Sequence, residues 1–505
     1  MKLYDLYNRA PTNRVMVVAI IVSMVAFLDS NVANLALPAT ERDLGGGLPL
    51  LQWVVDGYLL ALAALILPGG SISDLFGRVP VLRFGLAAFG TGSLLAAAAA
   101  WPSMLIAARL IQGLGGALLV PGSLALINSA FDRADRPAAI GSWTAWTSTA
   151  FALGPLLGGL TVDALGWRWI YIWLAIPVIV GFALTFWLHP TPAPAERARV
   201  DVAGAVLSAT GLGATVYALI EAQQRGWTSP MVALSLVVGV VALVAFVAWE
   251  RRAPHPMVPL QLLTTRNFAA ANLATAFVYG GLTLGSLATA LYLQEVAGYP
   301  AIVAGLSTLP SPIVSFLFAR RVGNAAARIG PRVFLVAGPV LAGVGLLLIR
   351  PYANDLGFAT SLLSGRLVLA AGLALIITPL SSVILIAVEP AHCGIAAAFQ
   401  NAVGRTSALT AVACLGLVAA GPLNDASFAR LLEVAAALFF LGAVVSGVAI
   451  ANQVAGAPTA DRCDADDPSR HVVTADPVVT VTAEQCVPCF QARQHGGLDA
   501  PRVHA

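Results

Sequence analysis

The stretch LIAARLIQGLGGALLVPG, residues 105–122, decides the fold of this chain. It is apolar except for Arg109, and no other charged residue occurs between Arg83 and Asp132. An apolar run of about 20 residues is long enough to cross a lipid bilayer as a helix. An ionised side chain inside a bilayer is costly and normally faces the interior of a helix bundle. We therefore expect Arg109 to lie on a membrane-spanning helix that lines a polar cavity.

Three glycines follow Arg109 within the same stretch, at Gly113, Gly115 and Gly116. Small residues strip a helix face down to its backbone, so that a neighbouring helix or a substrate comes close. We expect the other helices to be arranged around this one.

The composition of the whole chain is that of an integral membrane protein. Of its 505 residues, 58% are hydrophobic and only 10% are charged, and the mean hydropathy is +0.83. Soluble proteins carry about 25% charged residues. The apolar runs have the length of helices rather than of barrel strands, which need only about 10 residues. The net charge of +3, with no basic cluster, gives no indication of nucleic-acid binding.

The hydropathy pattern predicts about fourteen membrane-spanning helices. Their approximate ranges are 15–37, 52–70, 80–100, 103–128, 138–162, 168–188, 202–221, 230–249, 268–293, 301–319, 332–350, 358–386, 393–420 and 430–452. The first run contains Asp29 and is too long for a signal peptide, so we expect it to be retained. Lys and Arg are concentrated in alternate loops, which predicts that both termini are cytoplasmic.

Two motifs recur at a nearly constant offset along the chain. A spaced glycine pair followed by arginine occurs after the second and the tenth spans, and an arginine followed by proline occurs in the fourth and the twelfth. The first copy comprises Gly70, Gly77, Arg78, Arg109 and Pro121, and the second comprises Gly323, Gly330, Arg332, Arg366 and Pro379. Coincidence among glycine-rich helices is the alternative to two six-helix halves related by an axis along the membrane normal.

The repeat and the local composition divide the chain into four parts. We expect an N-terminal six-helix half at 1–188 and a C-terminal six-helix half at 268–455. A linker with two additional spanning helices and a cytoplasmic loop would occupy 189–267. The segment 456–505 is rich in Asp, Pro, Thr and Gly, which predicts a mostly disordered cytoplasmic tail.

Five segments resemble known motifs in the order of one family. They are LDSNVANLALP at 28–38, GGSISDLFGR at 69–78, LIAARLIQGLGGA at 105–117, ALGPLLGG at 152–159 and GWRWIY at 166–171. They are similar to the first-helix, loop, fourth-helix, antiporter and sixth-helix motifs of the major facilitator superfamily, fourteen-helix drug:proton antiporter type. The resemblance covers roughly residues 14–452, and it implies an all-helical fold of two six-helix halves with two extra helices between them.

Asp29 and Arg109 are the candidate proton-coupling residues. Desolvation disfavours the charged form of a carboxylate in a bilayer, whereas a nearby arginine favours it. That competition suits a proton carrier, and Arg109 would act electrostatically because it keeps its proton. The alternatives are a packing hydrogen bond made by Asp29 and a structural or snorkelling role for Arg109.

The resemblance also implies roles for two glycine-rich motifs. The loop motif would hold the inner side closed through an Asp74–Arg78 pair, unless that pair is only a solvated ion pair. The antiporter motif would bend the fifth span and hinder leak, or simply allow close helix packing. The loop motif comprises Gly70, Asp74, Gly77 and Arg78, and the antiporter motif comprises Gly154, Pro155, Gly158 and Gly159.

Several further polar residues are candidates for the cavity. We place Asp56 in the first turn of the second span, where the helix dipole would stabilise it or where it would attract cationic substrates. The other candidates are Asn34, Gln112, Gln294, Gln400, Asn401 and Arg366. No acid lies clearly inside the C-terminal spans, so we expect the coupling chemistry to sit in the N-terminal half.

Nothing in the sequence indicates an enzyme, a cofactor or a metal site. Phosphate-loop, H-E-x-x-H and G-x-S-x-G motifs are absent, so transport would draw on a gradient. Cys486 and Cys489, with Cys463 and His495, could supply zinc ligands, but their spacing fits no strong pattern. We interpret them as reduced thiols.

The sequence therefore predicts a proton-coupled antiporter that exports small hydrophobic or amphipathic compounds by alternating access. Its partners would be the substrate, protons and the lipids of the cell membrane, with the protein as a monomer. A dedicated transporter of one metabolite, such as a self-made antibiotic, siderophore, lipid or amino acid, is the second hypothesis. A non-transporting membrane sensor or scaffold that signals through 456–505 is the third.

Overall fold

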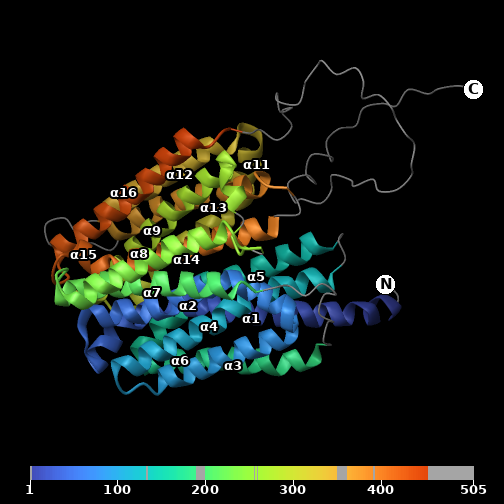
Figure 1. Cartoon of the computed structure of the whole chain (residues 1–505), viewed down its shortest axis with the longest axis horizontal. Coiled ribbons are helices and arrows are strands. Elements are labelled where there is room, and N and C mark those ends of the chain that lie inside the picture. The colour runs from blue at the N-terminus through green and yellow to red at the C-terminus, as the bar shows by residue number, and fades with distance from the viewer. Residues whose placement is uncertain are drawn as a thin grey trace, which may run out of the picture.

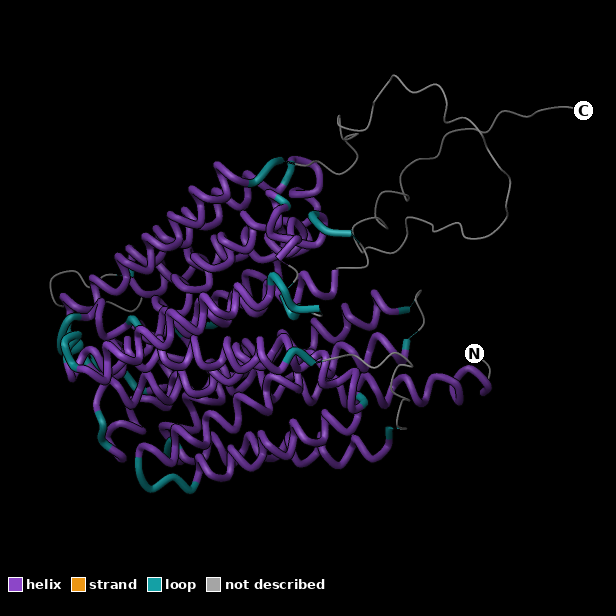
Figure 2. Tube along the Cα trace, in the orientation of Figure 1, coloured by secondary structure: helices purple, strands orange, loops and turns teal. Residues whose placement is uncertain are grey.

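The computed structural model describes residues 3–131, 135–188, 200–254, 256–258, 260–349, 361–389 and 393–452. These residues form helices joined by loops (Figure 2). The predicted tail at 456–505, with Cys463, Cys486, Cys489 and His495, lies outside the described residues.

The first six helices pack together as the N-terminal half (Figure 1). They are α1 (Leu3–Leu44), α2 (Gly47–Phe76), α3 (Arg78–Ala97), α4 (Pro102–Ala130), α5 (Arg136–Leu165) and α6 (Arg168–Leu184), followed by the short η1 (Thr185–Trp187). Helix α4 packs against α1, α2 and α3, so the apolar stretch 105–122 is at the centre of this half.

The C-terminal half is built in the same way, with two of its spans broken. It comprises α9 (Arg266–Glu295), α10 (Ala301–Leu306), α11 (Pro310–Ile329), α12 (Pro331–Leu348), α13 (Leu363–Ile386), α14 (Cys393–Ala413), α15 (Leu415–Ala419) and α16 (Asp425–Ala449). The tenth predicted span is interrupted between α10 and α11, where Pro310 begins the new helix and supplies no backbone donor. The thirteenth is interrupted between α14 and α15.

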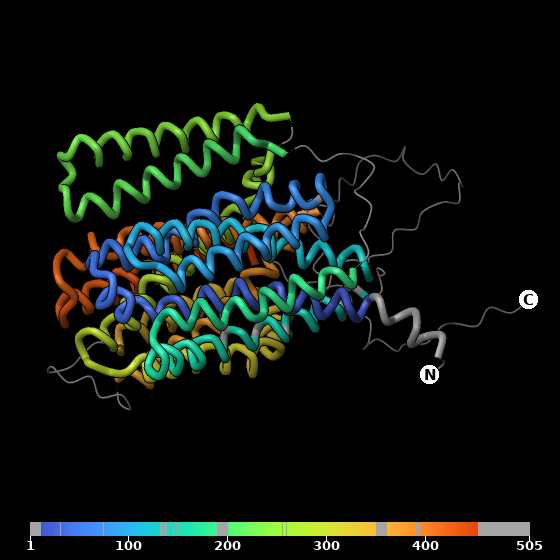
Figure 3. Tube along the Cα trace, turned by 90° about the horizontal axis from the view of Figure 1, so that it is seen from below, coloured from blue at the N-terminus to red at the C-terminus, as the bar shows by residue number. Residues whose placement is uncertain are grey.

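The two additional helices form a hairpin at one edge of the bundle (Figure 3). They are α7 (Val202–Arg225) and α8 (Pro230–Glu250), and the short η2 (Leu260–Thr264) leads into α9. Helix α7 packs against α2 and α14, whereas α8 exposes Val237, Val241 and Val244. An exposed row of valines on a helix this apolar is suited to lipid.

Twelve helical segments of the described chain are long and apolar enough to cross a membrane. Helices α5 and α14, at the fifth and thirteenth predicted spans, fall short of that measure, and α5 has its apolar part at Ala152–Leu165. Every predicted span coincides with a helix or helix pair. The all-helical architecture is confirmed, while the domain boundaries remain predictions.

Helices α1 and α2 extend beyond the first two predicted spans. Helix α1 continues to Leu44 and α2 already begins at Gly47, because helices extend beyond the hydrocarbon that the hydropathy pattern reports. The connection consists of Gly45 and Gly46, with φ values of 69° and 97°, and Gly47, the first residue of α2, has φ 62°. Glycine adopts such values without steric cost, which allows this short link between the two helices.

The repeated glycine motif occupies equivalent turns in the two halves. Gly77 joins α2 to α3 with φ 88° and ψ 143°, and Gly330 joins α11 to α12 with φ 98° and ψ 149°. A residue with a side chain is strained at these angles. The repeat seen in the sequence therefore marks the same backbone turn twice.

The two halves meet at one side of the bundle. We call the side where α1 begins and α16 ends the termini side, and the opposite side the far side (Figure 1). Towards the far side, α5 buries Gly158 and Gly159, whereas nearer the termini it exposes Gly141 and Trp146. Helix α14 follows the same gradient: Leu409, Val412 and Ala413 are buried, whereas Gly394, Ile395 and Ala397 are exposed. The halves are therefore packed together at the far side.

Candidate functional site

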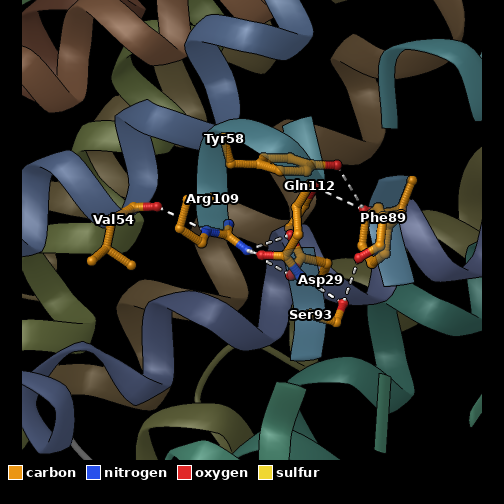
Figure 4. Close-up of polar contacts among 9 residues, drawn as sticks. Asp29, Val54, Tyr58, Phe89, Ser93, Arg109 and Gln112 are labelled. Carbon is orange, nitrogen blue, oxygen red and sulfur yellow. Dashed lines mark hydrogen bonds and ion pairs between the residues drawn. The ribbon is translucent and has the colours of Figure 1, made fainter. Parts of the chain in front are cut away.

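Arg109 and Asp29 meet inside the N-terminal half (Figure 4). The Arg109 Nη1 lies 2.7 Å from Asp29 Oδ1 and 3.0 Å from Oδ2. Arg109 is 1% exposed and Asp29 is 0% exposed. The sequence analysis predicted both residues, and the structure adds that α1 and α4 bring them into one buried ion pair.

Arg109 makes two further hydrogen bonds. Its Nε donates to the carbonyl oxygen of Val54 on α2 at 2.9 Å, and Nη1 donates to Gln112 Oε1 at 2.9 Å. Gln112 in turn donates to Ser93 Oγ on α3 at 2.9 Å. The network fixes the Arg109 guanidinium and links four helices, and it includes Gln112 from the predicted cavity residues.

Two tyrosines border the guanidinium, and the sequence analysis did not predict either. Arg109 Cζ lies 4.7 Å from the ring centre of Tyr58 on α2 and 5.9 Å from that of Tyr171 on α6. Both rings are buried. A cation over an aromatic face is attracted by the ring quadrupole, most strongly where water is excluded.

The glycines of α4 explain how the helices come so close. A Cβ on Gly113 would lie 2.4 Å from the Tyr58 carbonyl oxygen, and one on Gly116 would lie 3.0 Å from the Tyr58 hydroxyl. A Cβ on Gly115 would lie 2.6 Å from the carbonyl oxygen of Gly85 on α3. The prediction of one stripped face was therefore too simple, because the three glycines serve two neighbouring helices.

The arrangement can exchange a proton for a change of contacts. Removing one partner of a buried pair leaves an uncompensated charge, at a cost of about 3–5 kcal/mol. Protonation of Asp29 would cancel its charge and weaken its bond to Arg109, while Val54 and Gln112 would still hold the guanidinium. Within this network the Asp29 carboxylate is the group that joins α1 to Arg109 on α4.

Asp56 corrects one prediction. Helix α2 begins at Gly47, so Asp56 lies in the third turn rather than the first, beyond the reach of the helix N-terminus. Its side chain is fully buried, and among the described residues neither oxygen accepts a hydrogen bond. Asp56 is therefore a second buried acid of the N-terminal half and not a surface acid at a cavity mouth.

The other polar candidates do not join the Arg109 network. Asn34 is half-buried on α1, Gln400 is half-buried on α14, and Asn401 is exposed. Gln294 donates to the carbonyl oxygen of Ala290 on its own helix at 3.2 Å. Their contribution to a substrate cavity stays a prediction.

Arg366 is buried in the C-terminal half and differs from Arg109 in its contacts. It is 2% exposed, and its Nε and Nη2 have no hydrogen-bond partner among the described residues. Among the described residues it forms no ion pair. This state of the protein therefore offers Arg366 as a buried cation rather than as a lining residue of an open cavity.

The predicted loop gate is described only in part. Gly70 has open space around its Cα, and Gly77 makes the turn between α2 and α3. The Asp74 side chain lies outside the described part of the structure, so its pairing with Arg78 stays a prediction.

The antiporter motif packs against the other half. Pro155 lies inside α5, and a Cβ on Gly305 of α10 would lie 2.3 Å from the Pro155 carbonyl oxygen. A Cβ on Gly159 would lie 2.6 Å from the Ala301 carbonyl oxygen, and one on Gly158 would lie 2.7 Å from Val32 on α1. Gly154 is buried in the same helix. The motif allows near-backbone contact between the halves at the far side.

The sequence that folds into this bundle of two repeated helical halves matches a known family. The model of the Major Facilitator Superfamily matches residues 19–411. The chain belongs to this family. Its members are membrane transporters, so the protein is a multi-pass transporter and not an enzyme, as the sequence predicted.

Several proteins similar to this chain are named for resistance to drugs or antibiotics. The multidrug resistance protein Stp of Mycobacterium tuberculosis (strain CDC 1551 / Oshkosh) is 36% identical over 404 residues, which cover 79% of this chain and 74% of Stp. The methylenomycin A resistance protein of Bacillus subtilis (strain 168) is 33% identical, covering 80% and 87% of the two chains. The puromycin resistance protein pur8 of Streptomyces alboniger is 34% identical, covering 80% and 81%.

Solved structures share the fold at low identity. The inward open conformation of the xylose transporter XylE from E. coli has a TM-score of 0.61 at 15% identity, covering 88% of this chain and 98% of that one. The peptide transporter POT in complex with sulfate has a TM-score of 0.64 at 14% identity, covering 86% and 93%. These likenesses support the fold of the major facilitator superfamily for the chain.

Proposed function

We propose that the protein exports small hydrophobic or amphipathic compounds in exchange for protons, by alternating access in the cytoplasmic membrane. The relatives named for resistance to several drugs, to methylenomycin A and to puromycin support the export role. The ion pair of Asp29 with Arg109 is the observation that carries the proton coupling.

The proposed cycle alternates protons and substrate. Asp29 binds a proton from the acidic side, its bond to Arg109 weakens, and α1 and α4 lose a contact that holds them together. Release of the proton on the other side restores the pair. Arg109 keeps its proton and its hydrogen bonds to Val54 and Gln112 throughout the proposed cycle. Its guanidinium therefore stays in position to bind Asp29 again when the carboxylate loses its proton.

The orientation follows from the charge distribution. The positive-inside rule places the termini side in the cytoplasm and the far side outside. The closed far side then makes this state inward-facing, with the substrate path open to the cytoplasm from which compounds are exported. We propose that the transporter works as a monomer.

Transport by purified protein in liposomes with an imposed pH gradient tests the proposal. The panel comprises a lipophilic cation such as ethidium, a neutral drug and an anion. We expect gradient-driven movement of several compounds, reduced by about two orders of magnitude in Asp29→Asn because that side chain cannot release a proton.

Asp56→Asn is the matched control, since Asp56 is a buried acid of the same half without an arginine partner. We expect it to retain more gradient-driven transport than Asp29→Asn. Undiminished pH-driven efflux in a folded Asp29→Asn variant would refute the coupling role of Asp29.

A dedicated exporter of one metabolite is the second candidate function. Relatives carry names such as "Probable actinorhodin transporter" of Streptomyces coelicolor (33% identical) and "Cephamycin export protein CmcT" of Amycolatopsis lactamdurans (32% identical). Movement of a single compound out of a chemically varied panel would favour it.

A further inference from the structure

A carboxylate of the N-terminal half binds the first turn of a helix in the C-terminal half. Asp163, near the end of α5, accepts hydrogen bonds from the backbone N–H groups of Ala301 (N to Oδ1, 2.9 Å) and Ile302 (N to Oδ2, 2.8 Å). These two groups begin α10. The contact lies at the far side, where the halves are closed.

The position of Asp163 is unfavourable for its own helix and favourable for the other. An acid near a helix C-terminus meets the negative end of the helix dipole, whereas an acid at an N-terminus is stabilised. The first N–H groups of a helix have no acceptor within it, and Pro300 at the N-cap has no side-chain acceptor. Helix α10 therefore takes its cap from the other half.

Gln52 makes a second contact of the same kind. From α2, its Nε2 donates to the carbonyl oxygens of Val412 at 2.7 Å and Ala413 at 3.0 Å, where α14 ends. The last carbonyl groups of a helix also lack partners within it. Gln223 on α7 donates to Gln52 Oε1 at 3.1 Å and so holds the amide in place.

Both contacts require the halves to touch. Beside Asp163, α5 and α10 approach so closely that a Cβ on Gly159 or Gly305 would overlap the opposite backbone. Separation of the halves at this side breaks the bonds of Asp163 and Gln52 together. Asp163 is exposed, so its carboxylate regains water when the contact opens, whereas Gln52 is buried.

We propose that Asp163 and Gln52 are the latch of the outer gate. They cap helix ends of the C-terminal half, stabilise the state that is closed to the outside, and must release for the outward-open state to form. The proposal rests on the alternating access of the proposed function, but the latch needs neither a substrate nor a proton gradient to be observed.

Distances between spin labels across the outer side test the latch. The labels are placed at Ala100→Cys, between α3 and α4, and at Ala426→Cys on α16, both exposed. The remaining cysteines are replaced in this background. We expect Asp163→Ala to increase the ratio of the long-distance to the short-distance population about fivefold, as for loss of one helix cap. Gln52→Leu should act in the same direction.

Asp201→Ala is the matched control. Asp201 caps its own helix α7 by accepting from the Gly204 N–H at 2.8 Å, without joining the two halves. Its removal should leave the distance distribution unchanged. Asp163→Asn retains one acceptor oxygen and should give a smaller shift, which provides a milder variant if Asp163→Ala does not fold.

Unchanged distributions in folded Asp163→Asn and Gln52→Leu would overturn the proposal, and so would an equal shift in Asp201→Ala. A shift of the expected size together with absent drug transport would leave the latch standing and remove the proposed substrate range.

Discussion

Arg109 in α4 and Arg366 in α13 occupy equivalent places in the two halves, and within the described residues only Arg109 has a counter-ion. Each is buried and each is followed by a proline inside its helix, Pro121 in α4 and Pro379 in α13. Arg109 binds Asp29 at 2.7 Å. The Nε and Nη2 of Arg366 have no acceptor in the described part of the chain.

Each half of the repeat therefore has a buried arginine. Among the described residues, only the arginine of the N-terminal half has an acidic partner. A buried charge is tolerable when it is paired and bonded, and costly when it is alone. The N-terminal half therefore contains a complete network whose charge can change with one proton. The C-terminal half contains a cation that nothing in the described residues neutralises.

The largest expected change in stability comes from breaking the ion pair of Arg109 with Asp29. Arg109→Gln leaves the Asp29 carboxylate buried without its partner, which should lower the free energy of unfolding by about 3–5 kcal/mol. The Asp29→Asn/Arg109→Gln double variant should recover most of that loss, because both charges are gone. Thermal unfolding of the purified variants measures this, and additive losses would contradict the pairing.

Removing the charge of Arg366 should not lower the free energy of unfolding. Arg366→Met removes a buried charge and keeps much of its volume. We expect the free energy of unfolding to be unchanged or to rise by about 1–2 kcal/mol, measured in the same thermal unfolding experiment. A loss of stability as large as that of Arg109→Gln would show that other groups stabilise the charge of Arg366. It would contradict the proposed difference between the two arginines.

The smallest effect is expected from an ion pair at the surface. At the far side, Arg168 binds the Asp43 carboxylate, and Trp167 also donates to it. The hydrogen bond from Arg168, followed by that from Trp167, holds the pKa of Asp43 below its usual range. Both charged side chains are well exposed, so the pair should contribute less than about 1 kcal/mol.

The pH dependence of this pair has a defined sign. A lowered pKa in the folded state adds stability above the unfolded value of about 3.9, and that stability is lost as the pH falls through the folded value. The melting temperatures of the parent and Asp43→Asn should differ slightly at neutral pH and converge as the pH falls through the lowered pKa of Asp43. A difference that grows on acidification would contradict the assignment.

The spans, and the two charged residues Asp29 and Arg109 within them, were predictable because they depend on local pattern. An isolated charge such as Arg109 in an apolar run stands out, and so does Asp29 in the first span. Their contact was not predictable, since it depends on how α1 packs on α4. Tyr58 was missed because a tyrosine in an apolar helix looks like ordinary core, although Gly113 and Gly116 indicated that some neighbour lies close.

The gate contacts were missed for a different reason. Asp163 and Gln52 lie near helix ends, where polar residues are common and carry no pattern of their own. Their partners are backbone groups of α10 and α14. The sequence does not show when a helix end without a cap of its own is capped by a residue from another part of the chain. Asp56 was wrongly placed in the first turn of its helix for a related reason. The sequence did not show that α2 already begins at Gly47.

The ion pair of Arg109 with Asp29 also constrains how the chain enters the membrane during synthesis. Its partners are 80 residues apart, with two complete helices between them. An arginine near a helix centre adds about 2.5–3.5 kcal/mol to the free energy of insertion. Helix α1 must therefore remain beside the insertion machinery until α4 emerges, so that the first and fourth helices leave it as a neutral pair.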